Sequence, residues 1–160
     1  MSELEAIPMP VVDSPTVPTR EKIDTLQAEL SKLPQCTDIK TEHIFHAGMY
    51  CRKAWIPAGT CAVGRVHKTM HLFMCVSGEM VVWSETGMRH LTAGDVIQSG
   101  PGTKRVAYAL TDATMMNVHR TDITDVEQLE EELLEPDTST MYDIHNHVLI
   151  EKAFAALKEL

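Results

Sequence analysis

The chain lacks any apolar run close to the roughly 20 residues that a bilayer-spanning helix needs. It also lacks, near its first residue, the basic segment followed by an apolar one that forms a secretory signal. These two absences predict a protein that is made in the cytoplasm and has no membrane partner. Its 160 residues are about one domain's worth, enough to bury one sizeable core.

Positive charge is scarce as well. The formal net charge is -9, and residues 121–160 carry 11 acids and two bases. A field of this sign repels phosphate, so we expect no direct nucleic-acid partner. The usual sequence signals for a serine nucleophile, a phosphate-cradling loop and a zinc knuckle do not occur. The four cysteines are best explained as small buried apolar residues.

The chain divides into four segments. Residues 1–18 contain four prolines without periodicity, which is typical of an extended arm. Residues 19–35 predict an N-terminal helix that Thr19 caps and Pro34 stops. Residues 36–120 are rich in short strands, and residues 121–160 predict acidic C-terminal helices.

Two helices are expected in the acidic segment. The first opens with a capping box, Thr124-x-x-Glu127, and ends before Pro136. The second carries Ile150, Phe154 and Leu157 along one side. We interpret the acidic residues as a solvated helical face, with a surface for a basic partner as the alternative.

Seven strand-like runs follow one another in the third segment, at residues 50–56, 60–67, 71–76, 80–84, 96–99, 106–110 and 114–119. Turns rich in Gly, Pro, Asp and Ser separate them. Many short strands with such punctuation predict an all-β sandwich or barrel. No helix fits between the strands, which excludes a parallel βαβ design.

Within these strands the order Gly59, His67, His71, Gly78, then Gly94-Asp95 and Pro101-Gly102 resembles the two motifs of the cupin superfamily. The first family motif is a glycine, H-x-H, a glutamate and a second glycine. The second motif begins with Gly-Asp and reaches Pro-x-Gly-x-x-His. The resemblance implies a cupin (RmlC-like) jelly roll, a double-stranded β-barrel, here with flanking α-helices at the N- and C-termini. It also implies a metal ion held inside the barrel by three histidines and the glutamate.

The ligand positions depart from this pattern. Counting back from Gly78 places His71 at the glutamate position, His67 at the second histidine and Arg65 at the first. Counting from Pro101-Gly102 places Arg105 where the last histidine belongs. Arginine has no lone pair for a metal. The resemblance therefore implies a cupin barrel with an altered metal site.

A closer resemblance, over nearly the whole chain, is to small cupin-like proteins encoded by tailed bacteriophages. The segments that carry it are Leu33-Pro34-Gln35, Ala47-Gly48-Met49-Tyr50, His67-Lys68-x-x-His71, Pro101-Gly102-Thr103-Lys104-Arg105 and Val118-His119. In those relatives a glutamate would precede the second histidine, where this chain has Met70. The resemblance implies a phage protein, located in the cytoplasm of the bacterial host and in the virion.

Three hypotheses for the function follow. The first is a metal site in which His67 and His71 bind one divalent transition metal (Zn, Fe, Ni or Cu), with His119 as the candidate third ligand. The second is an anion pocket in which Arg65 and Arg105, with Lys104, hold a carboxylate or phosphate. The alternative for these basic residues is pairing with acids of the barrel itself.

The third hypothesis, which we favour from the sequence, is a non-enzymatic structural or interaction protein. It would be a phage particle component or accessory factor built on the barrel. The arm of residues 1–18 and the acidic helices would contact other phage structural proteins. The barrel and arm would also make a homo-oligomer.

Overall fold

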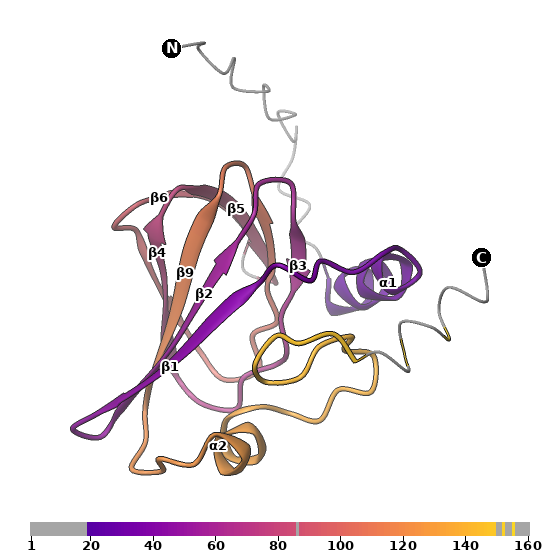
Figure 1. The fold of residues 1–160 in the computed structure, drawn as a ribbon. Helices are drawn as coiled ribbons and strands as arrows, with labels where there is room; N and C mark the ends of the chain where they lie inside the picture. The colour runs from indigo at the N-terminus through magenta and orange to yellow at the C-terminus, as the bar shows by residue number, and fades with distance from the viewer. Residues whose placement is uncertain (1–18, 86, 150–151, 153–154, 156–160) are drawn as a thin grey trace.

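A computed structural model describes residues 19–85, 87–149, 152 and 155. In this part of the chain nine antiparallel strands form two sheets that face each other (Figure 1). The larger sheet has the order β1-β2-β9-β4-β7 and the smaller β3-β8-β5-β6. The strands are β1 (Lys40–His46), β2 (Met49–Ile56), β3 (Cys61–Val63), β4 (His71–Ser77), β5 (Glu79–Ser84), β6 (Gly87–Thr92), β7 (Val96–Ser99), β8 (Val106–Ala109) and β9 (Ala113–Arg120).

The seven predicted runs all contain strands, and the prediction of an all-β core with flanking helices is confirmed. Two strands, β1 and β6, were missed because their sequences are mostly polar. The predicted run at residues 60–67 is wrong in extent, because only Cys61–Val63 pairs with a neighbouring strand. The residues that follow form a loop, and this loop carries His67.

The main core lies between the sheets. Alternate residues of each strand point inward, and the members of this core cluster are at most 4% exposed: Ile56, Phe73, Cys75, Met80, Val82, Leu91, Ala107, Ala109 and Ala113. The core fills the end of the barrel away from α2. The buried polar residues His71, Asn117 and His119 lie toward the other end of the same inner face of the larger sheet.

The N-terminal helix is confirmed as α1 (Arg20–Ser31). The Thr19 hydroxyl accepts the Lys22 amide, as expected of an N-cap, and the helix ends before Pro34. Ile23 is 1% exposed, so one narrow face of the helix is buried. Figure 1 places α1 beside β3. None of the helices described in the structure is long and apolar enough to cross a membrane.

The first C-terminal helix is present as α2 (Val126–Leu133), but its cap is Asp125 and not Thr124. The Asp125 carboxylate accepts the Gln128 amide at 3.0 Å. A threonine cap at residue 124 would instead have accepted the amide of residue 127, so the helix starts one residue later than predicted. Leu129 and Leu133 are buried against Tyr50 of β2. The helix therefore covers one end of the barrel.

After α2 the chain is irregular up to residue 149. Within this stretch, an isolated bridge between Tyr142 and Val148 closes a loop. The expected second helix is not formed by residues 135–149. Its apolar residues Ile150, Phe154 and Leu157 lie outside the described residues, as does the predicted arm of residues 1–18.

Candidate metal centre

His67 lies in the loop between β3 and β4, and the protein holds this loop from two sides. The Lys68 amide donates to the Leu133 carbonyl at 2.7 Å, and His67 forms an isolated bridge with Leu134. On the other side the His67 carbonyl accepts the Gly102 amide at 2.8 Å. The end of the acidic helix thus fixes the backbone of a candidate ligand.

His71 and His119 lie on neighbouring strands of the larger sheet. His71 begins β4, His119 is the last residue but one of β9, and their chain neighbours Leu72 and Val118 are register partners. This antiparallel register sets the two histidines opposite each other on one face. Both are buried, at 5% and 3% exposed.

The structure brings the three predicted ligands together as a stack of rings. The centroid of the His67 ring is 4.1 Å from that of His71 and 5.1 Å from that of His119, and the latter two are 4.8 Å apart. One nitrogen from each ring lies within 4.8 Å of the other two. A loop and two strands therefore supply a compact set of three imidazoles.

Two nitrogens of the cluster, His67 Nδ1 and His71 Nε2, are buried and have no hydrogen-bond partner among the described residues. His71 Nδ1 lies 3.0 Å from the Thr69 carbonyl oxygen. A carbonyl only accepts, so Nδ1 carries the proton and Nε2 presents a lone pair. Metal-binding histidines have this arrangement because the hydrogen bond at the second nitrogen fixes the ring and its tautomer.

The environment keeps the three imidazoles neutral. Burial, followed by His71, His119 and the arginines Arg105 and Arg52, lowers the pKa of His67 to about 2. Burial, followed by His71 and Arg52, lowers the pKa of His119 to about 4. The pKa of His71 is also lowered, by burial and then by Arg105, although its hydrogen bond to the Thr69 carbonyl acts in the opposite direction and raises it. Neutral imidazole is the form that binds a metal.

The two arginines at the remaining motif positions differ in their surroundings. Arg105 is 9% exposed, its guanidinium carbon lies 4.4 Å from the Phe73 ring centroid, and it donates to Ser99 Oγ at 2.5 Å. Arg65 pairs with Glu130 of α2 and donates to the backbone carbonyl of residue 135. Part of the acidic charge of the C-terminal segment thus meets a basic residue of the same chain.

Lys104, the third residue of the predicted anion pocket, faces α1. Its Nζ lies 2.7 Å from the Asp24 carboxylate, 2.6 Å from Gln27 Oε1 and 3.7 Å from Asp137. Lys104 is 4% exposed, and it does not line the cavity of about 160 Å³ that adjoins His67. Its ammonium joins the N-terminal helix to the barrel and to the chain after α2.

Replacing Lys104 by methionine is expected to lower the free energy of unfolding by about 2 kcal/mol, because a buried ion pair loses one partner. The estimate lies below that for a fully buried pair because Asp24 is half exposed. Equilibrium urea denaturation measures the loss. In the matched control, Lys53→Met, the cation pairs with an exposed glutamate at 3.8 Å, so we expect a change below about 0.5 kcal/mol. Equal losses in both variants would contradict a structural role for Lys104.

Arg52 and Asn117 are site residues that the sequence reasoning missed. They are register partners on β2 and β9, two positions along each strand from Tyr50 and His119. Asn117 Oδ1 is buried and unpartnered within the described part of the chain. Strand alternation was the available signal, because residues 50, 52, 54 and 56 share one face of β2.

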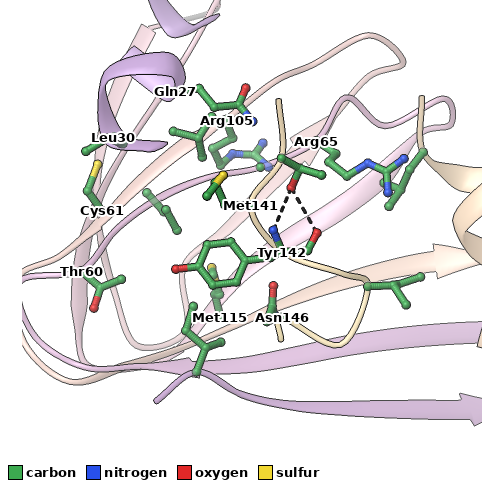
Figure 2. A pocket seen from close by; sticks show the side chains of 18 of the residues that line it. Gln27, Leu30, Thr60, Cys61, Arg65, Arg105, Met115, Met141, Tyr142 and Asn146 are labelled. Carbon is green, nitrogen blue, oxygen red and sulfur yellow. Dashed lines mark hydrogen bonds between the residues drawn. The ribbon is translucent and has the colours of Figure 1, made fainter. Parts of the chain in front are cut away.

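A cavity of about 160 Å³ adjoins the His67 side of the cluster. Figure 2 shows Arg105, Met141 and the Tyr142 ring around it. His71 and His119 line a different hollow of about 580 Å³, together with Ser99. His67 thus lines one hollow, and His71 and His119 line the other.

The loop of residues 141–149 closes one side of the 160 Å³ cavity. Nδ1 of His145 lies 2.9 Å from Nε2 of His43, whose Nδ1 lies 2.7 Å from the Tyr50 hydroxyl. The Tyr50 ring stacks on His119 with centroids 6.2 Å apart. The two neighbouring histidines of this loop differ, since His145 contacts His43 of β1 and the His147 side chain is 75% exposed.

No family model matches the chain, and no curated protein matches its sequence. Solved structures do match. Ectoine synthase from P. lautus has a TM-score of 0.50 and 19% identity, covering 71% of this chain and 86% of that chain. KdgF from Halomonas sp. has a TM-score of 0.49 and 18% identity, covering 58% and 87%. An RmlC-like cupin from Shewanella frigidimarina has a TM-score of 0.48 and 21% identity, covering 57% and 84%.

Sequence identities of 18–21% show a similarity of fold alone. The resemblance to phage-encoded proteins is not tested by these structures and stays a prediction. The chain has the all-β fold of a cupin-like jelly roll with flanking α-helices, and three of its histidines lie close enough together to hold one metal ion.

Proposed function

We propose that the protein is a metal-binding cupin that holds one divalent transition-metal ion through His67, His71 and His119. The observation that carries the proposal is the pair of buried, unpartnered ring nitrogens within a cluster of three neutral imidazoles. Each buried polar atom left unpaired costs about 1–3 kcal/mol. An ion that accepts these lone pairs would remove that cost.

The donor set favours some metals over others. Three imidazole nitrogens suit Zn²⁺, Fe²⁺, Ni²⁺ or Cu²⁺, whereas Ca²⁺ and Mg²⁺ prefer oxygen ligands. Three protein ligands also leave a coordination position for water or a small ligand, as in catalytic rather than structural zinc sites. When bound, the ion would supply a Lewis acid to whatever occupies that position.

The chain's own residues prepare the site for this role. The Thr69 carbonyl orients the His71 ring, and the contacts between the His67 loop and α2 hold His67 against it. Burial keeps each ring neutral, so binding an ion would not require a proton to leave an imidazolium.

Metal content per chain tests the proposal directly. Untagged protein purified without chelators is analysed by elemental mass spectrometry, and we expect close to one transition-metal ion per chain. His71→Ala and His67→Ala should each lower the content at least about tenfold, because a three-ligand site loses one ligand. The matched control is His90→Ala, since His90 is an exposed histidine that pairs with Glu79 at 3.1 Å; its metal content should not change.

Circular dichroism of each variant separates loss of metal from loss of fold. If the wild-type protein stays metal-free after dialysis against Zn²⁺, Ni²⁺, Cu²⁺ and anaerobic Fe²⁺, the proposal is wrong. The same conclusion follows if metal binds equally well in His71→Ala and in the wild type.

The role of a structural or interaction protein in a phage particle stays a prediction, as do the homo-oligomer and the phage partners. Metal binding at the barrel end does not conflict with such a role. The arm of residues 1–18, on which the partner prediction depends most, lies outside the described residues.

A further inference from the structure

We infer that the cavity beside the three histidines binds a small carboxylate with an apolar body, whose charge is held by Arg52 and Arg105. Such a ligand would lie next to the ion of the proposed metal centre, so its part in the function rests on that proposal. Binding of the carboxylate itself depends only on the cavity and its arginines.

Arg105 is a buried cation without a paired carboxylate in the described part of the chain. The acid that acts on it most is Glu85, and Glu85 is engaged by Arg20 at 2.6 Å. Burial lowers the pKa of Arg105 to about 10, which leaves the guanidinium charged at neutral pH. One N–H donates to Ser99, and the fork has five N–H groups in all. A carboxylate would meet both the charge and the remaining donors.

The hydrogen bonds of Arg52 go only to neutral acceptors among the described residues, while the Asp143 and Glu130 carboxylates act on its charge without bonding to it. Arg52 donates to the Ile144 carbonyl at 3.0 Å and to Asn146 Oδ1 at 2.7 Å. The cavity lining contains one carboxylate, Asp143, whose Oδ1 accepts two backbone amides of its own loop at 2.9 Å. Three guanidinium groups line the cavity, and one of them, Arg65, is already paired with Glu130. The lining thus keeps an excess of positive charge.

Unpartnered polar atoms gather at the same cavity. Of the four buried side-chain atoms without a partner in the described residues, two are assigned to the proposed metal centre, and the other two, Arg65 Nε and Asn117 Oδ1, belong to the cavity lining. Asn117 is 9% exposed, and a half turn of its amide offers either an oxygen or an NH₂ group to a ligand. Buried polar atoms are rarely left unpaired, so this concentration marks a place where a ligand supplies the partners.

The volume and the apolar part of the lining limit the size of the ligand. An engineered apolar cavity of about 150 Å³ holds benzene, so 160 Å³ suits a body of about six to nine non-hydrogen atoms. Phe73, Ala107, Met115 and Met141 line the cavity and would contact that body. The Arg105 guanidinium rests on the Phe73 ring, which places the cationic fork at an apolar wall.

Calorimetric titration of the full chain with benzoate, cyclohexanecarboxylate and butyrate tests the inference, with the corresponding uncharged amides beside them. We expect the acids to bind and to raise the Tm. The amides should bind at least about tenfold more weakly, because they lose the charge-assisted hydrogen bonds. Arg105→Met should weaken binding of the acids by about tenfold or more. Arg89→Met removes an exposed arginine of β6 and should leave binding unchanged.

Arg52→Met is the second variant if Arg105→Met does not fold. Each titration is repeated on chelator-treated protein and on His71→Ala, because His71 does not line this cavity. Carboxylate binding that survives without metal and is lost in Arg105→Met or Arg52→Met supports the carboxylate site even if the metal proposal fails. Metal binding without carboxylate binding overturns the carboxylate site alone. Equal binding of acids and amides, or of acids by wild type and both arginine variants, also overturns it.

Discussion

Replacing Phe73 by alanine is expected to lower the free energy of unfolding by about 3–5 kcal/mol. The ring is 3% exposed and belongs to the core between the two sheets. Truncation removes apolar area from the core and leaves a cavity that the flanking strands can only partly close. It also removes the surface on which the buried Arg105 guanidinium rests.

Urea denaturation followed by circular dichroism measures this loss. The matched control is Leu72→Ala, which alters the preceding residue on the opposite face of β4; Leu72 is 37% exposed. We expect that change to cost less than about 1 kcal/mol. A similar loss in both variants would mean that β4 does not present Phe73 to the core in the register described here.

The second large effect is expected at Gly78, where alanine should lower the free energy of unfolding by about 3 kcal/mol or more. The residue has φ +74, a region that costs an L-residue roughly 1–2 kcal/mol. A Cβ there would also lie 2.1 Å from the Asp112 carbonyl oxygen and 2.8 Å from Thr111 Oγ1. The turn at residues 111–112 would have to move away, although the Leu110 and Thr111 amides tie this segment to β5 by hydrogen bonds to the Glu79 carbonyl.

Gly59→Ala separates the two causes. Gly59 has a similar φ of +82, but a Cβ there would meet nothing within 4 Å. We therefore expect a loss of about 1 kcal/mol, the cost of the backbone conformation without the clash. An equal loss of unfolding free energy in the two variants would show that the contact between a Cβ and the turn contributes nothing at Gly78. The same urea denaturation measures both.

Much of the fold could be predicted from the sequence because cupin motifs are largely turn signals. Gly59, Gly78, Gly94 and Gly102 all have positive φ, and each lies at a turn between strands. Glycine adopts that conformation without steric cost, so its spacing is visible in the sequence. Strands β1 and β6 could not be predicted in this way. Their residues are mainly exposed, and pairing with β2 and β5 makes them strands.

The candidate metal centre was predicted in part. His67 and His71 were named from motif positions and His119 from its strand, and the structure places them together. Arg65 and Arg105 occupy comparable positions in the motifs, but one turns to Glu130 of α2 and the other to the Phe73 ring. Motif spacing could not distinguish these outcomes, because the deciding partners come from other elements.

By itself, the sequence determined the antiparallel barrel, its turns, the start of the N-terminal helix and three candidate ligands, since these depend on local conformation and on residue chemistry. Only the tertiary structure decided that Lys104 joins α1 to the barrel and that Arg52 and Asn117 line a cavity beside His67. Those outcomes depend on which strands and loops meet across the barrel. Such contacts join residues far apart in the chain, and no local pattern encodes them.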